Sequence, residues 1–255
     1  MKHLRFLAAV CCMAAVFTAC EKNEPSDNTN GNGINTDQNG GNSNTGSDNA
    51  TGTENGYEWV GLGLPSGTKW ATCNVGATTP EAYGDYYAWG ETEPKTTYDW
   101  STYKWCDGTD DTQTKYCNQT SNGKDGFTDN KTTLELADDA VRANWGGAWR
   151  MPTDAEWTEL RTNCTWTWTD DYNGTGVAGR IVTSKTNGNH IFLPAAGYRG
   201  DDVLYGAGSY GRYWSSSLGA DNPNNAWYMF FRSDGVFRGN YTRCYGLSVR
   251  PVLGE

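Results

Sequence analysis

The chain has 255 residues, a net charge of -10 and 36% hydrophobic residues, but 13% of its residues are aromatic. All 12 Trp and all 15 Tyr lie after residue 56, and such a content of large aromatic side chains excludes a wholly disordered protein. The acidic balance disfavours binding to nucleic acid and to a polybasic-selective membrane surface, because both depend on positive charge.

The first twenty residues predict a lipoprotein leader. A basic start is followed by an apolar run from Phe6 to Phe17, which is too short to cross a bilayer as a helix. The run ends in Phe17-Thr18-Ala19-Cys20, which resembles the lipobox of bacterial lipoproteins. We therefore expect a signal peptide over 1–19 and lipidation of Cys20. The alternative is an ordinary secretory signal in which the cysteine occurs by chance.

Residues 20–56 predict a lipidated N-terminus followed by a flexible tether. This segment is dominated by Asn, Gly and Thr and has only Ile34 and Ala50 as apolar residues after the cysteine, so it cannot form a core. As a coil it spans about 30–36 Å. Its first acidic residues, Glu21, Glu24 and Asp27, resemble the surface-export signals of Bacteroidetes lipoproteins. The expected location is the outer membrane, with the protein exposed at the cell surface.

Residues 57–255 are expected to form one domain. Alternating apolar residues predict early strands over 57–62 and 69–75. Helical spacing predicts helices over 134–144 and 153–163, the second opening on the capping box Thr153-Asp154-Ala155-Glu156.

After residue 175 the sequence reads as short strands separated by Gly, Asn and Asp turns. The predicted strands cover 177–184, 190–194, 211–217, 226–232, 236–241 and 247–252. Ser233-Asp234-Gly235 predicts a tight hairpin between the fourth and fifth of them. Early helices followed by antiparallel strands indicate the α+β class.

The strand 226–232 predicts an exposed binding surface. Trp227, Met229 and Phe231 form an apolar face, so Tyr228, Phe230 and Arg232 are expected on the other one. Exposed Tyr, Phe and Arg side chains are typical of protein interfaces. The alternative is that loops bury both faces of the strand.

The cysteines indicate an oxidising compartment. Five remain after the leader and Cys20, and no C-x-x-C pair suggests zinc. Cys106 and Cys117 flank a polar loop, which predicts a local disulfide worth about 3 kcal/mol. Cys73 with Cys164 is a second candidate pair, which leaves Cys244 unpaired.

Enzymatic chemistry has little support in the sequence. The mature chain has one histidine, His190, within a predicted strand, where a structural role is the ordinary one. No glycine-rich phosphate loop opens a helix. We therefore expect a non-enzymatic protein without a cofactor or a catalytic metal, although the acidic residues of 57–197 leave structural calcium open.

Six motifs together resemble one family, the Fibrobacter major paralogous domain family, which is common in Bacteroidetes lipoproteins. The motifs are Gly61–Ala77 (GLGLPSGTKWATCNVGA), Tyr86–Thr92 (YYAWGET), Asn144–Thr153 (NWGGAWRMPT), Phe192–Arg199 (FLPAAGYR), Tyr213–Ser217 (YWSSS) and Ser248–Val252 (SVRPV). The resemblance covers about residues 57–252.

The resemblance implies a C-type-lectin-like fold related to the formylglycine-generating enzymes. Relatives of the family resemble variable proteins of diversity-generating retroelements, whose C-terminal strands carry hypervariable exposed side chains. The ligand-binding residues implied here are Arg212, Tyr213, Tyr228, Phe230, Arg232, Phe237, Arg238, Asn240, Tyr241, Arg243 and Tyr245. Residues 198–254 carry six Arg, no Lys and four Asp, a net charge of +2, which favours an anionic partner.

The expected function is thus a surface lipoprotein that presents a ligand-binding face to an unknown protein or glycan. Calcium-dependent sugar binding is not expected, because Asn222-Pro223-Asn224 lacks the carboxylate of the lectin motifs. Two alternatives remain: an enzyme related to the formylglycine-generating group, which needs a reactive thiol such as Cys244, and a structural or adhesion module.

Overall fold

The structure is a computed structural model that describes residues 51–219 and 221–254. The chain divides into two compact units, 1–44 and 45–255, and the described residues all belong to the second. The predicted signal peptide, the lipidation site Cys20 and most of the predicted tether lie outside the described residues.

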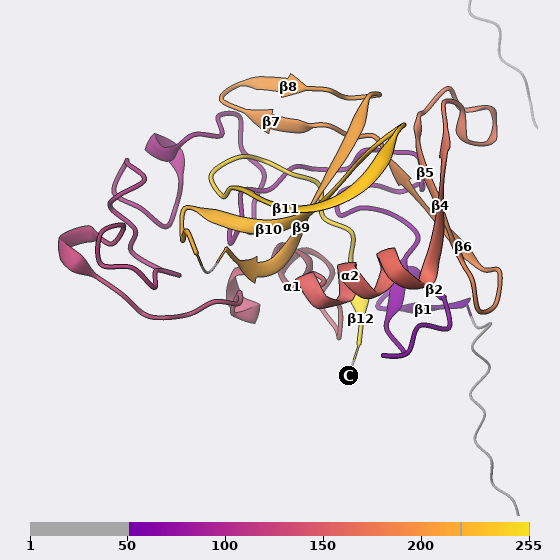
Figure 1. The fold of residues 1–255 in the computed structure, drawn as a ribbon, viewed down its shortest axis with the longest axis horizontal. Coiled ribbons are helices and arrows are strands. Elements are labelled where there is room, and N and C mark those ends of the chain that lie inside the picture. The colour runs from indigo at the N-terminus through magenta and orange to yellow at the C-terminus, as the bar shows by residue number, and fades with distance from the viewer. Residues whose placement is uncertain (1–50, 220, 255) are drawn as a thin grey trace, which may run out of the picture. The chain divides into compact units, whose positions relative to one another are not determined.

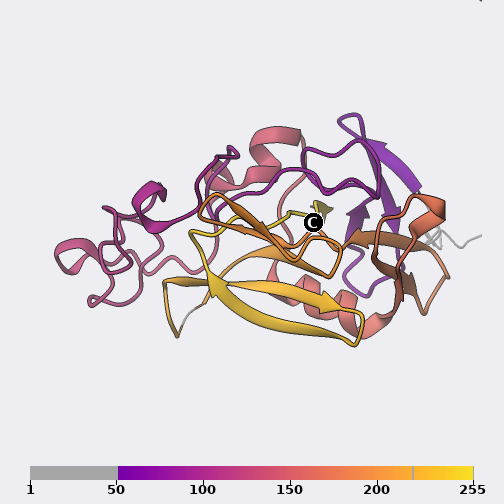
Figure 2. The same cartoon turned by 90° about the horizontal axis from the view of Figure 1, so that it is seen from above.

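The described residues form an α+β fold in which the named strands pair antiparallel in three sheets and one hairpin (Figures 1 and 2). One sheet has the order β1-β2-β3-β12, with strands Thr51–Glu54, Tyr57–Gly61, Lys69–Ala71 and Val252–Leu253. The second has the order β4-β5-β6, with strands Cys164–Thr169, Gly179–Ser184 and His190–Pro194. The third has the order β11-β10-β9, with strands Gly235–Thr242, Asn225–Arg232 and Tyr210–Leu218, and Tyr198–Gly200 (β7) pairs with Val203–Tyr205 (β8).

The start of the domain differs from the prediction. The tether was expected to run to residue 56, but Thr51–Glu54 form β1 and pair with β2, Thr51 opposite Val60. Asn55 and Gly56, with φ of 50° and 85°, make the two-residue turn between them. Asn-Gly is the favoured pair for such a turn, since both positions need positive φ. The hairpin gives hydrogen-bond partners to backbone groups of residues 51–54, which the composition had predicted to be coil.

The helices follow their capping signals. α2 covers Asp154–Asn163, and the predicted capping box is confirmed: the Thr153 hydroxyl accepts from the Glu156 amide while Glu156 accepts from the Thr153 amide at 2.8 Å. The other helix, α1, covers only Ala140–Trp145. Residues 134–139 of the predicted helix instead include a 3-10 turn, and Asp139 caps α1 by accepting from the Val141 amide at 2.8 Å.

Most of the late strands are confirmed, and the exceptions have a structural reason. The predicted strand 247–252 is wrong for residues 247–251, which make only isolated bridges, to Tyr87 from Leu247 and to Tyr213 from Ser248. Strands β4, β7 and β8 were not predicted. Their alternation is obscured because β8 is exposed on every residue and β4 is only partly buried.

A buried arginine holds three segments of the core together. The Arg250 side chain is fully buried and donates to the Asn74 amide oxygen at 2.9 Å and to the Thr72 and Phe192 carbonyl oxygens at 2.6 and 2.9 Å. It also donates to the Ala71 carbonyl at 2.9 Å. Arg250 thereby joins the C-terminal segment to the residues after β3 and to β6.

The β9–β11 sheet has one face covered by α2 and one face turned away from it (Figure 1). On the covered face, the Trp157 indole of α2 donates to the Trp214 carbonyl at 3.0 Å, and its ring lies 5.9 Å from that of Tyr213. Met229 and Phe231 are buried on this same face. The opposite face of the sheet is where the predicted binding residues gather.

Candidate functional site

Strand register places a row of side chains across the face that α2 does not cover. Arg212 of β9 lies opposite Phe230 of β10, and Phe230 lies opposite Phe237 of β11. Residues directly opposite in an antiparallel pair point to the same face. The two phenylalanine rings stack with centroids 5.7 Å apart. The predicted two-residue hairpin at Ser233-Asp234 sets this register, since Arg232 pairs with Gly235.

Further aromatic rings surround this row and define a surface that we call the Arg212 face. Tyr198 stacks on Tyr205 at 5.2 Å and on Tyr210 at 6.4 Å, so hairpin β7–β8 continues the aromatic surface of the sheet. Tyr198 also lies 5.4 Å from Tyr241 and 5.8 Å from Tyr245. The Arg212 face consists of Tyr198, Tyr205, Tyr210, Arg212, Tyr228, Phe230, Arg232, Phe237, Tyr241 and Tyr245.

Arg212 lies in an aromatic cage at the centre of this face. Its guanidinium carbon is 4.0 Å from the centroid of the Tyr241 ring and 4.4 Å from that of Tyr198. The rings of Tyr210, Phe230 and Tyr228 lie at 5.3, 5.5 and 5.7 Å. A cation over aromatic faces is stabilised by the ring quadrupoles. The cage therefore holds the charge in place without neutralising it.

The Arg212 guanidinium has unused hydrogen-bonding capacity. Its Nε and Nη1 atoms are inaccessible to solvent and have no hydrogen-bond partner among the described residues. No described carboxylate lies within ion-pair distance of it, whereas Arg232 pairs with Asp234 at 2.5 Å. A buried donor without a partner costs about 1–3 kcal/mol. The third nitrogen, Nη2, also has no hydrogen-bond partner among the described residues but is not shielded from solvent, so an incoming acceptor would meet the guanidinium there.

The tyrosines of the face contribute hydroxyl groups rather than charge. Burial raises the pKa of Tyr210 and Tyr228 above its ordinary value, and burial together with a hydrogen bond to Tyr241 raises that of Tyr198. All three are therefore neutral near pH 7. The charge of the Arg212 face comes from its arginines alone.

Several apolar side chains are exposed on or next to this face. Val203, Leu204 and Tyr205 of β8 are 43%, 38% and 41% exposed, and Phe237 is 43% exposed. Tyr205 and Phe237 belong to the Arg212 face, and Val203, two residues before Tyr205, extends it along β8, whereas Leu204 points to the other side of the hairpin. Clustered apolar exposure of this kind marks interaction surfaces.

The structure places four of the predicted ligand-binding residues outside the Arg212 face, and two of them are fully buried. Tyr213 is fully buried on the α2 side of the sheet and donates to the Pro194 carbonyl at 2.7 Å. Arg243 is fully buried after β11 ends and donates to the Tyr116 carbonyl at 2.8 Å and to the Gln113 side chain. A ligand cannot touch either one without opening the core.

The other two residues are exposed on the opposite side of β11. Arg238 lies opposite Met229, makes an ion pair with Asp154 at 2.6 Å and covers the Trp227 ring at 3.5 Å. Asn240 lies opposite Trp227 on that same side. The remaining seven predicted residues share the Arg212 face, so the predicted set stays clustered. They are Arg212, Tyr228, Phe230, Arg232, Phe237, Tyr241 and Tyr245.

Sequence reasoning missed three residues of the face, Tyr198, Tyr205 and Tyr210. Tyr198 belongs to the FLPAAGYR motif, but nothing in one sequence tells that it packs on Arg212. Tyr210 was detectable, because it lies two residues before Arg212 in a strand and must therefore share its face.

The predicted disulfides are corrected, since all five described cysteines are free. The Cys106 thiol donates to the Trp100 carbonyl and the Cys117 thiol to the Gln119 carbonyl, each at 3.1 Å. These thiols therefore have separate partners, although their loop is short. Cys164 is buried in the hydrophobic cluster that includes Trp157 and Leu160 of α2, whereas Cys73 is partly exposed beside Thr72.

Groups that could support catalysis are dispersed. The Cys244 thiol is buried, and burial raises its pKa to about 12, which is the opposite of an activated thiol. His190 is exposed at the start of β6. Within 51–219 and 221–254, no three His, Cys, Asp or Glu side chains come together as a possible metal site.

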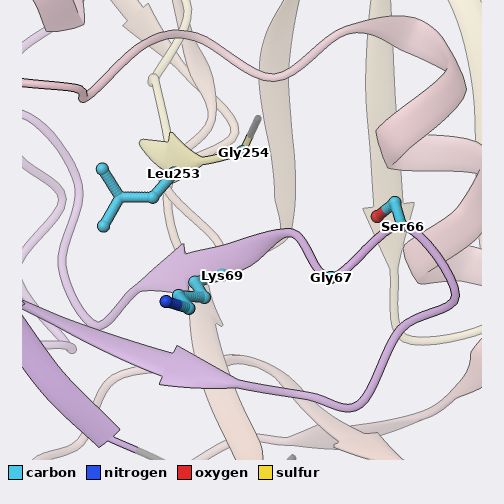
Figure 3. A pocket seen from close by; sticks show the side chains of 5 residues that line it. All are labelled: Ser66, Gly67, Lys69, Leu253 and Gly254. Carbon is cyan, nitrogen blue, oxygen red and sulfur yellow. The ribbon is translucent and has the colours of Figure 1, made fainter. Parts of the chain in front are cut away.

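Two pockets among the described residues are lined by side chains outside the Arg212 face. One of about 340 Å³ is lined by Ser66, Gly67, Lys69, Leu253 and Gly254. Figure 3 shows that the Ser66 hydroxyl and the Lys69 ammonium lie at opposite ends of this pocket. A second of about 450 Å³ includes Lys95 and Arg199, and Lys95 is already paired with Glu91 at 2.9 Å.

Comparison with known proteins adds little to these observations. A family model described as a domain of unknown function (DUF8237) matches residues 181–252, the region that includes β9, β10 and β11. No curated protein and no solved structure matches the chain. No helix among the described residues is long and apolar enough to cross a membrane.

Proposed function

We propose that this protein is an outer-membrane lipoprotein that presents the Arg212 face as a ligand-binding surface on a C-type-lectin-like scaffold. The α+β architecture is compatible with that scaffold, and the sequence motifs that resemble the Fibrobacter major paralogous domain family favour it. The lipobox-like Cys20 supplies the anchor. Cys20→Ala is expected to abolish labelling of the protein by palmitate analogues in growing cells.

The observation that carries the proposal is the caged Arg212, which has no partner among the described residues and keeps its Nη2 atom open to solvent. A ligand bound at this surface would explain why the guanidinium is left unpaired. The surrounding tyrosines supply large contact areas with few rotatable bonds, as they do in antibody paratopes. The site is a face rather than a cleft, which suits a macromolecular ligand.

The test is binding of the full-length protein, purified in detergent, to immobilised host and bacterial cell-surface material. Replacing Tyr228, Phe230 and Arg232 together by Ala should lower retention at least about tenfold, because few interface residues carry most of the binding energy. The control variant replaces Thr158, Arg161 and Thr162, which are exposed on α2, and should bind as the wild type does. Unchanged retention of a folded Tyr228/Phe230/Arg232 variant would refute the site.

Diversification by a retroelement is the second part of the proposal, and it rests on the resemblance. The expected genomic context is a reverse transcriptase gene beside a near-repeat of the segment that encodes the C-terminal strands. Substitutions among related copies should then fall on Tyr228, Phe230, Phe237 and Tyr241. Variation that falls instead on the buried Tyr213 would contradict this part.

The enzyme alternative is not favoured by the surroundings of Cys244. A thiol nucleophile needs access and a lowered pKa, and this thiol is buried with its pKa raised to about 12. A structural or adhesion role would use the same aromatic face against a partner subunit. Light scattering of the purified protein separates a monomeric receptor from such an assembly.

A further inference from the structure

We infer that Arg212 is the anion-recognition centre of this surface and that its ligand is a protein segment carrying an Asp or Glu side chain flanked by apolar residues. This inference rests on the proposed function and specifies its ligand class. It follows from the unused donors of one guanidinium, from the lack of acids around it and from the chemistry of the rings beside it.

The first step is the demand for an anion. The rings nearest to the guanidinium carbon are those of Tyr241 and Tyr198, with centroids at 4.0 and 4.4 Å, and they restrict its orientation. Its Nε and Nη1 atoms have no acceptor. Its Nη2 atom, which is open to solvent, can donate to a carboxylate oxygen, and such a charge-assisted bond is about twice as strong as a neutral one.

The second step is that no acid of this domain meets the demand. Asp234, which follows β10, is held by Arg232 at 2.5 Å. Asp154 is held by Arg238 at 2.6 Å on the other side of the sheet. The ten residues of the Arg212 face include no acid, and since Arg232 is paired with Asp234, Arg212 is the unpaired charge on this face that complements an acidic ligand.

The third step separates a protein ligand from a carboxylated sugar. Sugar hydroxyl groups are bound chiefly through Asp and Glu carboxylates, which accept, and through Asn and Gln amides, which both accept and donate. The Arg212 face has none of these, and its only such groups are tyrosine hydroxyls. It offers instead the stacked Phe230 and Phe237 rings and the exposed Val203 side chain. Apolar side chains on either side of the carboxylate would bury this surface.

The probes are two matched pools of immobilised pentapeptides, acetylated and amidated so that no terminal charge remains. One pool has Glu and the other Gln at the centre, and the remaining positions are drawn from Val, Leu, Phe and Tyr. The full-length protein in detergent should be retained about tenfold or more strongly by the Glu pool, since a charge-assisted hydrogen bond is worth more than this factor requires. The preference should weaken with added salt.

Two substitutions assign the preference to the guanidinium. Arg212→Gln should remove the difference between the pools, while Arg161→Gln makes the same charge change on exposed α2 and should keep it. Phe237→Ala alters an exposed side chain and should weaken retention on both pools. Thermal unfolding of each variant confirms that it is folded. Equal retention of the wild type on both pools, or a Glu preference that survives in folded Arg212→Gln, would overturn the inference.

A sugar arm keeps this inference distinct from the proposed function. Immobilised 3′-sialyllactose should not retain the protein. Arg212-dependent retention on this sugar without retention on either peptide pool would overturn the protein ligand while leaving the face in place. The proposed function itself fails only if the Tyr228, Phe230 and Arg232 variant binds cell-surface material as the wild type does.

Discussion

Replacing Arg250 tests how the core is held together. Its guanidinium donates four hydrogen bonds at 2.6–2.9 Å, to Asn74 and to three backbone carbonyls, and no carboxylate accompanies it. In Arg250→Met the apolar chain is roughly retained and all four acceptors lose their donor inside the protein. Each buried acceptor left without a donor costs about 1–3 kcal/mol, and part of this is offset because the variant no longer buries a charge, so we expect a net loss of about 3–5 kcal/mol.

The assay is unfolding of the full-length protein followed by tryptophan fluorescence, since Trp70, Trp89 and Trp149 are fully buried. For a domain of this size each kcal/mol shifts Tm by about 2–4 °C, so Arg250→Met should lower Tm by about 6–20 °C. The control Arg161→Met changes an exposed arginine and should stay within about 0.5 kcal/mol of wild type. If Arg250→Met matches this control, the role given to Arg250 is wrong.

Three further predictions concern the cap of α2, the reactivity of the cysteine thiols and the dependence of stability on acidic pH. Thr153→Ala removes the cap of α2 and should lower the free energy of unfolding by about 1 kcal/mol in urea titrations, and no change would contradict the capping geometry. A thiol reagent at pH 8 should modify Cys73 and Cys106 in the folded protein. Buried thiols such as Cys244, whose pKa is raised to about 12, should react only after unfolding. Rapid labelling of Cys244 in the folded protein would contradict its burial. Hydrogen bonds from two lysines lower the pKa of Glu135 from 4.5 to about 2, so its contribution to stability is present above pH 4.5 and is lost as the pH falls toward 2. Glu135→Gln should therefore flatten the dependence of Tm on pH in this interval, and an unchanged slope would contradict the pairing.

Local signals in the sequence predicted much of the sheet that carries the site. Alternation over 226–232 identified which side of β10 is buried, and Met229 and Phe231 are indeed fully buried. Trp227 on that side is only partly buried, because it lies under Arg238 rather than inside the core. The Ser233-Asp234 turn fixed the register and therefore the row across the strands.

The errors in the predicted binding set arose because consecutive residues of a strand were grouped together although their side chains alternate between its two faces. Tyr213 follows Arg212 directly in β9, so one of the two must point into the core. For the same reason Phe237 and Arg238, which are neighbours in β11, point to opposite sides of the sheet. Arg243 lies beyond the end of β11, where alternation no longer applies and a network of carbonyl groups draws it inward.

The cage itself could not be predicted from one sequence. Tyr198 comes from a hairpin that precedes the sheet, and only tertiary packing brings its ring within 4.4 Å of Arg212. The burial of Arg250 was equally hidden, because an arginine in a C-terminal motif is ordinarily exposed. Both cases depend on contacts between segments distant in the chain, which local patterns do not encode.

The most direct test of the Arg212 face is covalent labelling of tyrosines in the free and the bound protein, read by mass spectrometry. On binding to the material that retains the protein, labelling of Tyr205, Tyr210 and Tyr241 should fall severalfold, since their rings belong to the contact surface. Tyr172, which stacks on Phe192 outside this face, should be labelled equally in both states. Protection of Tyr172 with unchanged labelling of the other three would contradict the account.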